Sequence, residues 1–148
     1  MHPRVELDFT SFTEGWALEE ITSWLTSPGA GDFLLEVGGE LRASGSWQVA
    51  SELPAGPLVL TSCSLATSGT CRQWRTRQEG AENHLIDPRT GYPVRHGTVS
   101  VSVLAADSLT ADGWATALIV LGAVEGLPLI GSEDLSKHSR PGRLILCP

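Results

Sequence analysis

The chain has 148 residues, of which 41% are hydrophobic and 18% charged, and it carries a formal net charge of −7 with a pI near 5.0. This length predicts one domain, residues 1–148, which buries roughly two-thirds of its unfolded surface. The acidic balance argues against a nucleic-acid partner and against an anionic membrane surface. We find no signal peptide and no apolar run long enough to span a membrane, so we expect a cytoplasmic protein.

The cysteines and arginines add two expectations. Cysteines stand at positions 63, 71 and 147, an odd number without metal-ligand spacing. We expect reduced thiols, with a disulfide between Cys63 and Cys71 as the alternative. Five arginines fall within residues 72–95. This cluster suits a bound phosphate or another acidic group, and it suits an ordinary solvated face equally well.

A first helix is predicted to begin at Ser11. Ser11 followed three residues later by Glu14 has the pattern of a capping box. Apolar residues then recur at helical spacing, and Pro28-Gly29 is expected to stop the helix. For the aromatic side chains among them, core packing is favoured over a ligand site. The apolar residues at this spacing are Phe12, Trp16, Ala17, Ile21, Trp24 and Leu25.

Apolar and alternating runs predict several β-strands, at residues 33–37, 46–50, 56–61, 99–103 and 143–147. The first ends at Gly38-Gly39, where two glycines allow either a plain hairpin turn or the close approach of a ligand to the backbone. Thr67 and Ser68 offer hydroxyls that either contact phosphate or ribose oxygens or form a local turn. Residues 72–83 are polar and are expected to form an exposed excursion.

Residues 84–93 are predicted to form a rigid loop. Pro88 and Pro93 fix their own φ angles and hold the residues before them in extended conformations. Residues 87–91 have the composition of a tight turn that closes on a glycine. Such a loop holds His84 and Asp87 in place. His84 is therefore either a proton acceptor near neutral pH or a cap for the Asp87 turn.

A second helix is predicted over residues 109–118, with Gly122 as its end. Asp112 and Thr116 stand four residues apart in it and share one face. A carboxylate and a hydroxyl at this spacing provide two hard oxygen ligands for Mg²⁺. The alternative for Asp112 is a carboxylate in the first turn that the helix dipole favours, and the alternative for Thr116 is a hydroxyl bonded to a backbone carbonyl. Together these elements predict an α+β fold, in which antiparallel strands pack against two main helices.

Five blocks of the sequence resemble, in the same order, the C-terminal half of the FAD:protein FMN transferase family, the ApbE family. The blocks are residues 7–17, 36–43, 65–69, 84–93 and 111–122. Blocks in this order over most of the chain are far more specific than a single glycine motif. The resemblance implies a T-fold-like half, and family members are usually about twice this length.

The resemblance also implies FAD and Mg²⁺ as the bound groups. It implies that the metal binds Asp112, Thr116 and a backbone oxygen in the turn that contains Ser11. The implied catalytic residues are His84, as the candidate base, and Asp112. The implied contacts with the flavin nucleotide are Gly38, Gly39, Glu40, Thr67, Ser68, His84 and Asp87.

The function implied by this resemblance is the transfer of FMN from FAD to a threonine or serine of an acceptor flavoprotein, with release of AMP. Water in place of the acceptor hydroxyl would give hydrolysis of FAD to FMN and AMP. We expect a second chain or a homodimer to complete the flavin pocket. The alternative, from a different class, is a flavin- or nucleotide-binding subunit or scaffold without catalytic activity.

Overall fold

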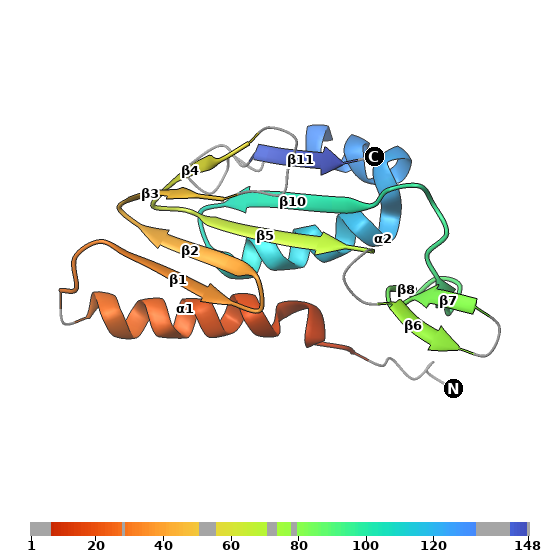
Figure 1. Ribbon diagram of the computed structural model, residues 1–148, viewed down its shortest axis with the longest axis horizontal. Helices are drawn as coiled ribbons and strands as arrows, with labels where there is room; N and C mark the ends of the chain where they lie inside the picture. Colours follow the sequence, from red (N-terminus) through yellow and green to blue (C-terminus); the bar gives the residue numbers. More distant parts are fainter. Residues whose placement is uncertain are drawn as a thin grey trace.

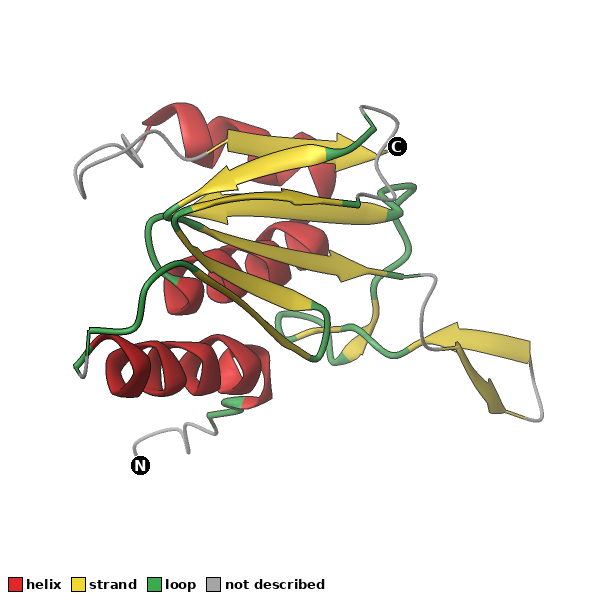
Figure 2. Cartoon of the chain, turned by 60° about the vertical axis from the view of Figure 1, so that its left-hand side comes forward, coloured by secondary structure: helices red, strands yellow, loops and turns green. Residues whose placement is uncertain are grey.

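The computed structural model describes residues 7–27, 29–50, 56–70, 74–77, 80–132 and 143–147. Its centre is a five-stranded antiparallel sheet in the order β1-β2-β5-β10-β11 (Figure 1). Two helices, α1 (Thr13–Thr26) and α2 (Ser108–Ser132), cover one face of this sheet (Figure 2). The predicted α+β class is therefore confirmed. The strands of the sheet are β1 (Phe33–Val37), β2 (Glu40–Ser44), β5 (Ser64–Gly69), β10 (Ser100–Ala105) and β11 (Arg143–Cys147).

The other described strands form three hairpins. They are β3 (Ser46–Val49) with β4 (Leu58–Thr61), β6 (Trp74–Arg77) with β7 (Gly80–Asn83), and β8 (Ile86–Asp87) with β9 (Tyr92–Pro93). All five predicted strands are present, with ends that differ by at most two residues. The expected excursion at 72–83 contains the β6–β7 hairpin, which lies outside the main sheet (Figure 1).

The sheet buries side chains on both faces because successive residues of a strand point to opposite sides. On β5, Ser64, Ala66 and Ser68 face α2, whereas Leu65 and Thr67 face away from it. The core on the α2 side consists of Ala66, Val101, Val103, Ala111, Ala115, Leu118 and Ile119. The core on the opposite side, under the β3–β4 hairpin, consists of Ala43, Val49, Leu60 and Leu65.

The start of α1 differs from the sequence prediction. A short 3-10 helix, η1 (Thr10–Phe12), precedes α1, and neither has a side-chain cap of the predicted kind. Instead, Asp8 Oδ1 accepts hydrogen bonds from the Thr10 backbone N–H at 2.9 Å and from the Thr10 hydroxyl at 2.7 Å. The capping box at Ser11 and Glu14 was wrong, because the short Asp8 side chain bonds its own backbone two residues on.

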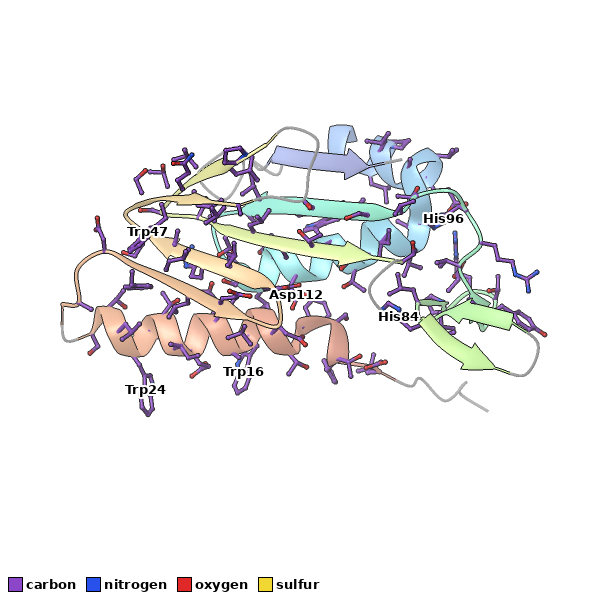
Figure 3. All side chains as sticks on the ribbon, viewed as in Figure 1. Trp16, Trp24, Trp47, His84, His96 and Asp112 are labelled. Atoms are coloured by element: carbon purple, nitrogen blue, oxygen red, sulfur yellow. The ribbon has the colours of Figure 1, made fainter. Side chains whose placement is uncertain are left out.

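The predicted core packing of the aromatic side chains near α1 was also wrong. Trp24 is 80% exposed, and Figure 3 shows Trp16 and Trp24 both pointing away from the sheet. Phe12 and Ile21 are exposed as well. The helix buries a neighbouring stripe instead, in which Gly15 allows the close approach of α2. This stripe consists of Gly15, Leu18 and Thr22.

The second helix is interrupted rather than ended at Gly122, which has φ 73° and ψ 172°. Asp107 caps its first turn, since Asp107 Oδ1 accepts the Thr110 N–H at 2.7 Å. By length and composition alone, Ser108–Leu129 is apolar enough to cross a membrane. In the structure, however, the first segment of this helix packs into the core beside the sheet. Elsewhere, Cys63 is a free, half-buried thiol, and Cys71 lies outside the described residues.

Candidate functional site

Asp112 lies at the contact between the two helices (Figure 3). It is only 4% exposed, and its Oδ2 accepts a hydrogen bond of 2.9 Å from the backbone N–H of Gly15 in α1. Burial raises the pKa of the Asp112 carboxyl; the Gly15 hydrogen bond lowers it in part, and the nearby Glu14 carboxylate raises it. A charged Asp112 is therefore costly in this environment, and a cation beside it would offset that cost.

The contact between the helices depends on glycine at two positions. A Cβ on Gly15 would lie 2.7 Å from the Ser108 carbonyl oxygen and 2.8 Å from Asp112 Cβ. A Cβ on Gly113 would overlap the ring of Phe12, the last residue of η1. These close approaches place η1, which contains Ser11, against the turn of α2 that carries Asp112.

Gly38 and Gly39 form the turn between β1 and β2, with φ angles of 65° and 105° that favour glycine. A Cβ on Gly38 would lie 2.7 Å from Glu14 Cγ, so this turn meets the start of α1 close to Asp112. Glu40 begins β2 and pairs with Val37. The hairpin turn is thus observed, and the contact of these residues with a flavin nucleotide stays a prediction.

The structure brings Thr116 and Ser68 together. Their hydroxyl oxygens lie 3.2 Å apart, and both residues are half-buried between α2 and β5. Thr67 points to the other face of the sheet, where its hydroxyl lies 2.8 Å from that of Ser102. Of the predicted hydroxyl pair, only Ser68 therefore lies on the face that carries Asp112 and Thr116.

The rigid loop is built around Asp87. The Asp87 carbonyl accepts the N–H groups of Thr90 (3.1 Å) and Gly91 (2.8 Å), which closes the predicted turn. Its carboxylate binds the Arg89 guanidinium, at 2.7 Å from Nη2, and the Arg89 backbone N–H at 2.9 Å. The Arg89 side chain and backbone hydrogen bonds together lower the pKa of Asp87. His84 is the first residue of this loop. It is half-buried and lies apart from Asp112 (Figure 3), and its catalytic role stays a prediction.

The groups near Asp112 include oxygen atoms of the kinds that Mg²⁺ takes as ligands. Within the described part of the chain, no three histidine, cysteine or acidic side chains gather as metal ligands. A site here would use the buried Asp112 carboxylate, the Thr116 hydroxyl one turn later and a backbone oxygen near Ser11. Mg²⁺ prefers such oxygen ligands, needs only one or two carboxylates and usually keeps several waters.

A groove that the sequence did not predict lies between residues 87–98 and the break in α2. Its volume is about 1030 Å³, and its lining includes Tyr92, Val94, His96 and Val120. The sequence signals this break only through Gly122 within an apolar run, a pattern that predicts a helix end. Residues 96–98, which lie between two predicted elements, gave no signal of their own.

The sequence of this chain was compared with known protein families and with curated proteins. Residues 1–137 match the model of the ApbE family. The FAD:protein FMN transferase of Haemophilus influenzae is 33% identical over 92% of this chain and 43% of its own length. The protein of the same name from Vibrio cholerae is 32% identical over 90% of this chain and 44% of its own length.

Solved structures show the same similarity. The apo form of the flavinyl transferase ApbE from Pseudomonas stutzeri matches 97% of this chain and 46% of that one, with a TM-score of 0.74 and 30% identity. The ApbE protein of Thermotoga maritima matches 95% of this chain and 48% of that one, with a TM-score of 0.77 and 26% identity.

The five-stranded sheet with its two helices defines an α+β protein, in which the buried Asp112 carboxylate lies at the contact between the helices. The sequence and structural matches then show that the chain belongs to the ApbE family, as the resemblance had indicated. The chain spans less than half the length of the curated relatives described above.

Proposed function

We propose that this chain takes part in the Mg²⁺-dependent transfer of FMN from FAD to a threonine or serine of an acceptor protein. The observation that supports this best is the nearly buried Asp112 carboxylate, 4% exposed, with the Thr116 hydroxyl one helical turn away. The proposal is further supported by the names of the relatives, which are FAD:protein FMN transferases.

In the proposed reaction, the acceptor hydroxyl oxygen forms a bond to the phosphorus of the FMN part of FAD. The bond between this phosphorus and the bridging oxygen breaks, and AMP leaves with that oxygen. His84 is the candidate base that takes the hydroxyl proton. Water as the nucleophile would give FMN and AMP, so we propose FAD hydrolysis as a side reaction.

Each part of the candidate site has a task in this reaction. Asp112 and Thr116 would hold Mg²⁺, which neutralises phosphate charge when bound. The Gly38-Gly39 turn and Ser68 are proposed to contact the nucleotide, and the Asp87 turn holds the segment that follows His84. We also propose that a second polypeptide or a second copy of this chain contributes to the flavin pocket.

The test is the release of AMP from FAD in the presence of Mg²⁺, with and without an acceptor protein. Asp112→Asn should abolish the Mg²⁺-dependent release. Asp107→Asn is the matched control, because it makes the same carboxylate-to-amide change at the cap of the same helix, where asparagine also caps well. Equal activity of the two variants would refute the role of Asp112. Binding of FAD without AMP release in any of these mixtures would instead favour a non-catalytic binding subunit.

A further inference from the structure

The break in α2 leaves backbone groups without their usual helical partners, and two side chains from the segment before β10 bond to them. The Val120 carbonyl oxygen lies 3.2 Å from His96 Nε2. The Ala123 N–H donates to Thr98 Oγ1 at 3.0 Å. A helix interrupted by a residue with the angles of Gly122 cannot supply these bonds from its own backbone. His96 and Thr98 therefore bridge the two segments of α2.

The position and hydrogen-bonding state of His96 are fixed by its neighbours. Its Nδ1 accepts the Thr98 backbone N–H at 3.3 Å. Because the Val120 carbonyl can only accept, its bond to His96 requires a hydrogen on Nε2, and the bond from the Thr98 N–H requires Nδ1 to accept; the two bonds form together in the Nε2–H tautomer. The ring also lies directly on Gly122, where an added Cβ would be 2.7 Å from His96 Cδ2.

The second segment of α2 is connected in turn to the loop that begins at His84. Glu125, three residues beyond the break, pairs with the guanidinium of Arg89. Arg89 binds the Asp87 carboxylate at 2.7 Å, and Asp87 closes the turn of the loop. A continuous set of contacts thus runs from Thr98 through α2 to Asp87.

We propose that His96 and Thr98 are positioning residues, which join the two segments of α2 and so hold the Asp87 loop, and with it His84, in the geometry of the reaction. The joining of the segments follows from the contacts above, and its effect on catalysis rests on the proposed function. Neither residue is expected to touch FAD or the acceptor.

The first test needs no substrate and compares Thr98→Val with Thr98→Ser. Valine has nearly the same shape but no acceptor, whereas serine keeps the hydroxyl. Hydrogen exchange of the Ala123 amide should accelerate about fivefold in Thr98→Val, the effect of one ordinary hydrogen bond, and little in Thr98→Ser. The buried Ala115 amide in the first segment serves as the reference and should be unchanged. Equal exchange at Ala123 in both variants would overturn the proposal.

A spectroscopic test addresses the other side of the bridge. The ¹⁵N spectrum of the His96 ring should show a protonated Nε2 and a bare Nδ1, and the opposite tautomer would refute the assignment. The amide resonance of Gly91, in the Asp87 turn, should shift in Thr98→Val and stay in place in Thr98→Ser. A Gly91 resonance that is the same in both variants would show that the bridge does not reach the loop.

Kinetics then separate positioning from folding. In Thr98→Val, kcat for AMP release should fall several-fold with the KM for FAD within about twofold, and Thr98→Ser should restore it. Because Glu125 lies on the same path, adding Glu125→Gln to Thr98→Val should cost less than the product of the two single effects. Effects that multiply would refute a shared path. If the unaltered chain releases no AMP, the proposed function fails, while amide exchange and the Gly91 resonance still decide whether the bridge exists.

Discussion

Replacement of Gly15 by alanine tests the link between the fold and the candidate site. Gly15 is the point at which α1 meets α2, and its N–H is the donor that holds Asp112 Oδ2 at 2.9 Å. The new methyl group would lie 2.7 Å from the Ser108 carbonyl oxygen and 2.8 Å from Asp112 Cβ. Neither is the flexible end of a side chain, so the helices themselves must move apart.

The size of the effect follows from two opposing terms. Alanine favours the helix over glycine by about 1 kcal/mol. Overpacking costs roughly 1 to 3 kcal/mol, and we expect the upper part, about 2 to 3 kcal/mol, because the contact is with backbone and with a Cβ atom. The neighbouring bond from the Ser108 N–H to Glu19 Oε1, at 2.6 Å, also resists separation of the helices. We expect a net loss of about 1 to 2 kcal/mol, or a fall in Tm of about 2 to 8 °C for a chain of this size.

Thermal unfolding followed by circular dichroism measures the stability, and titration calorimetry with Mg²⁺ measures the site. Gly15→Ala should lower Tm, and the proposed Mg²⁺ site predicts that it also lowers Mg²⁺ affinity, because movement of α1 withdraws the donor that fixes Asp112. Gly31→Ala is the matched control, since nothing lies within 4 Å of its added Cβ. A Gly15→Ala protein as stable as this control, with unchanged Mg²⁺ binding, would refute the described packing.

Three further outcomes are expected. Arg89 lowers the pKa of Asp87, so the stability that Asp87 contributes is present above about pH 4 and is lost as the pH falls through the lowered pKa. When Tm is measured from pH 6 downwards, the part of its fall that comes from protonation of Asp87 should be absent in Asp87→Asn. Leu60→Ala, at a fully buried position, should cost about 2 to 5 kcal/mol in denaturant unfolding. Trp24→Ser, at a side chain that is 80% exposed, should stay within about 0.5 kcal/mol.

The sequence predicted local features well because their causes are local. The strand at residues 33–37 has a run of apolar residues bounded by Gly38-Gly39, and the structure reproduces its limits. The turn at Asp87 follows from proline and glycine at fixed offsets, and its hydrogen bonds are those of the predicted turn. In both cases the residues that determine the conformation lie within a few positions of one another.

Features that depend on contacts between distant segments were not predictable in the same way. Helical spacing showed that α1 has an apolar stripe but not which stripe is buried. Gly15 contributes to that choice, because it allows the close approach of α2. Likewise, the spacing of Asp112 and Thr116 placed them on one face, whereas their partners come from elements 97 and 48 residues away in the sequence. The bridge at Gly122 was not predictable for the same reason, because His96 and Thr98 bond to Val120 and Ala123, which lie 24 and 25 residues further along the chain.

The chemistry of Asp112 argues for a role beyond packing. The Gly15 N–H is its hydrogen-bond donor, and an asparagine oxygen would accept that bond without the cost of burying a charge. The raised pKa of Asp112 reflects this cost, and the nearby Glu14 carboxylate adds to it. A purely structural role therefore predicts that Asp112→Asn is as stable as the unaltered protein or more so. A cation site predicts the same stability without Mg²⁺, but also that the rise in Tm on adding Mg²⁺ is lost. The two roles thus differ in the response to the ion, which melting curves of this one variant with and without Mg²⁺ measure.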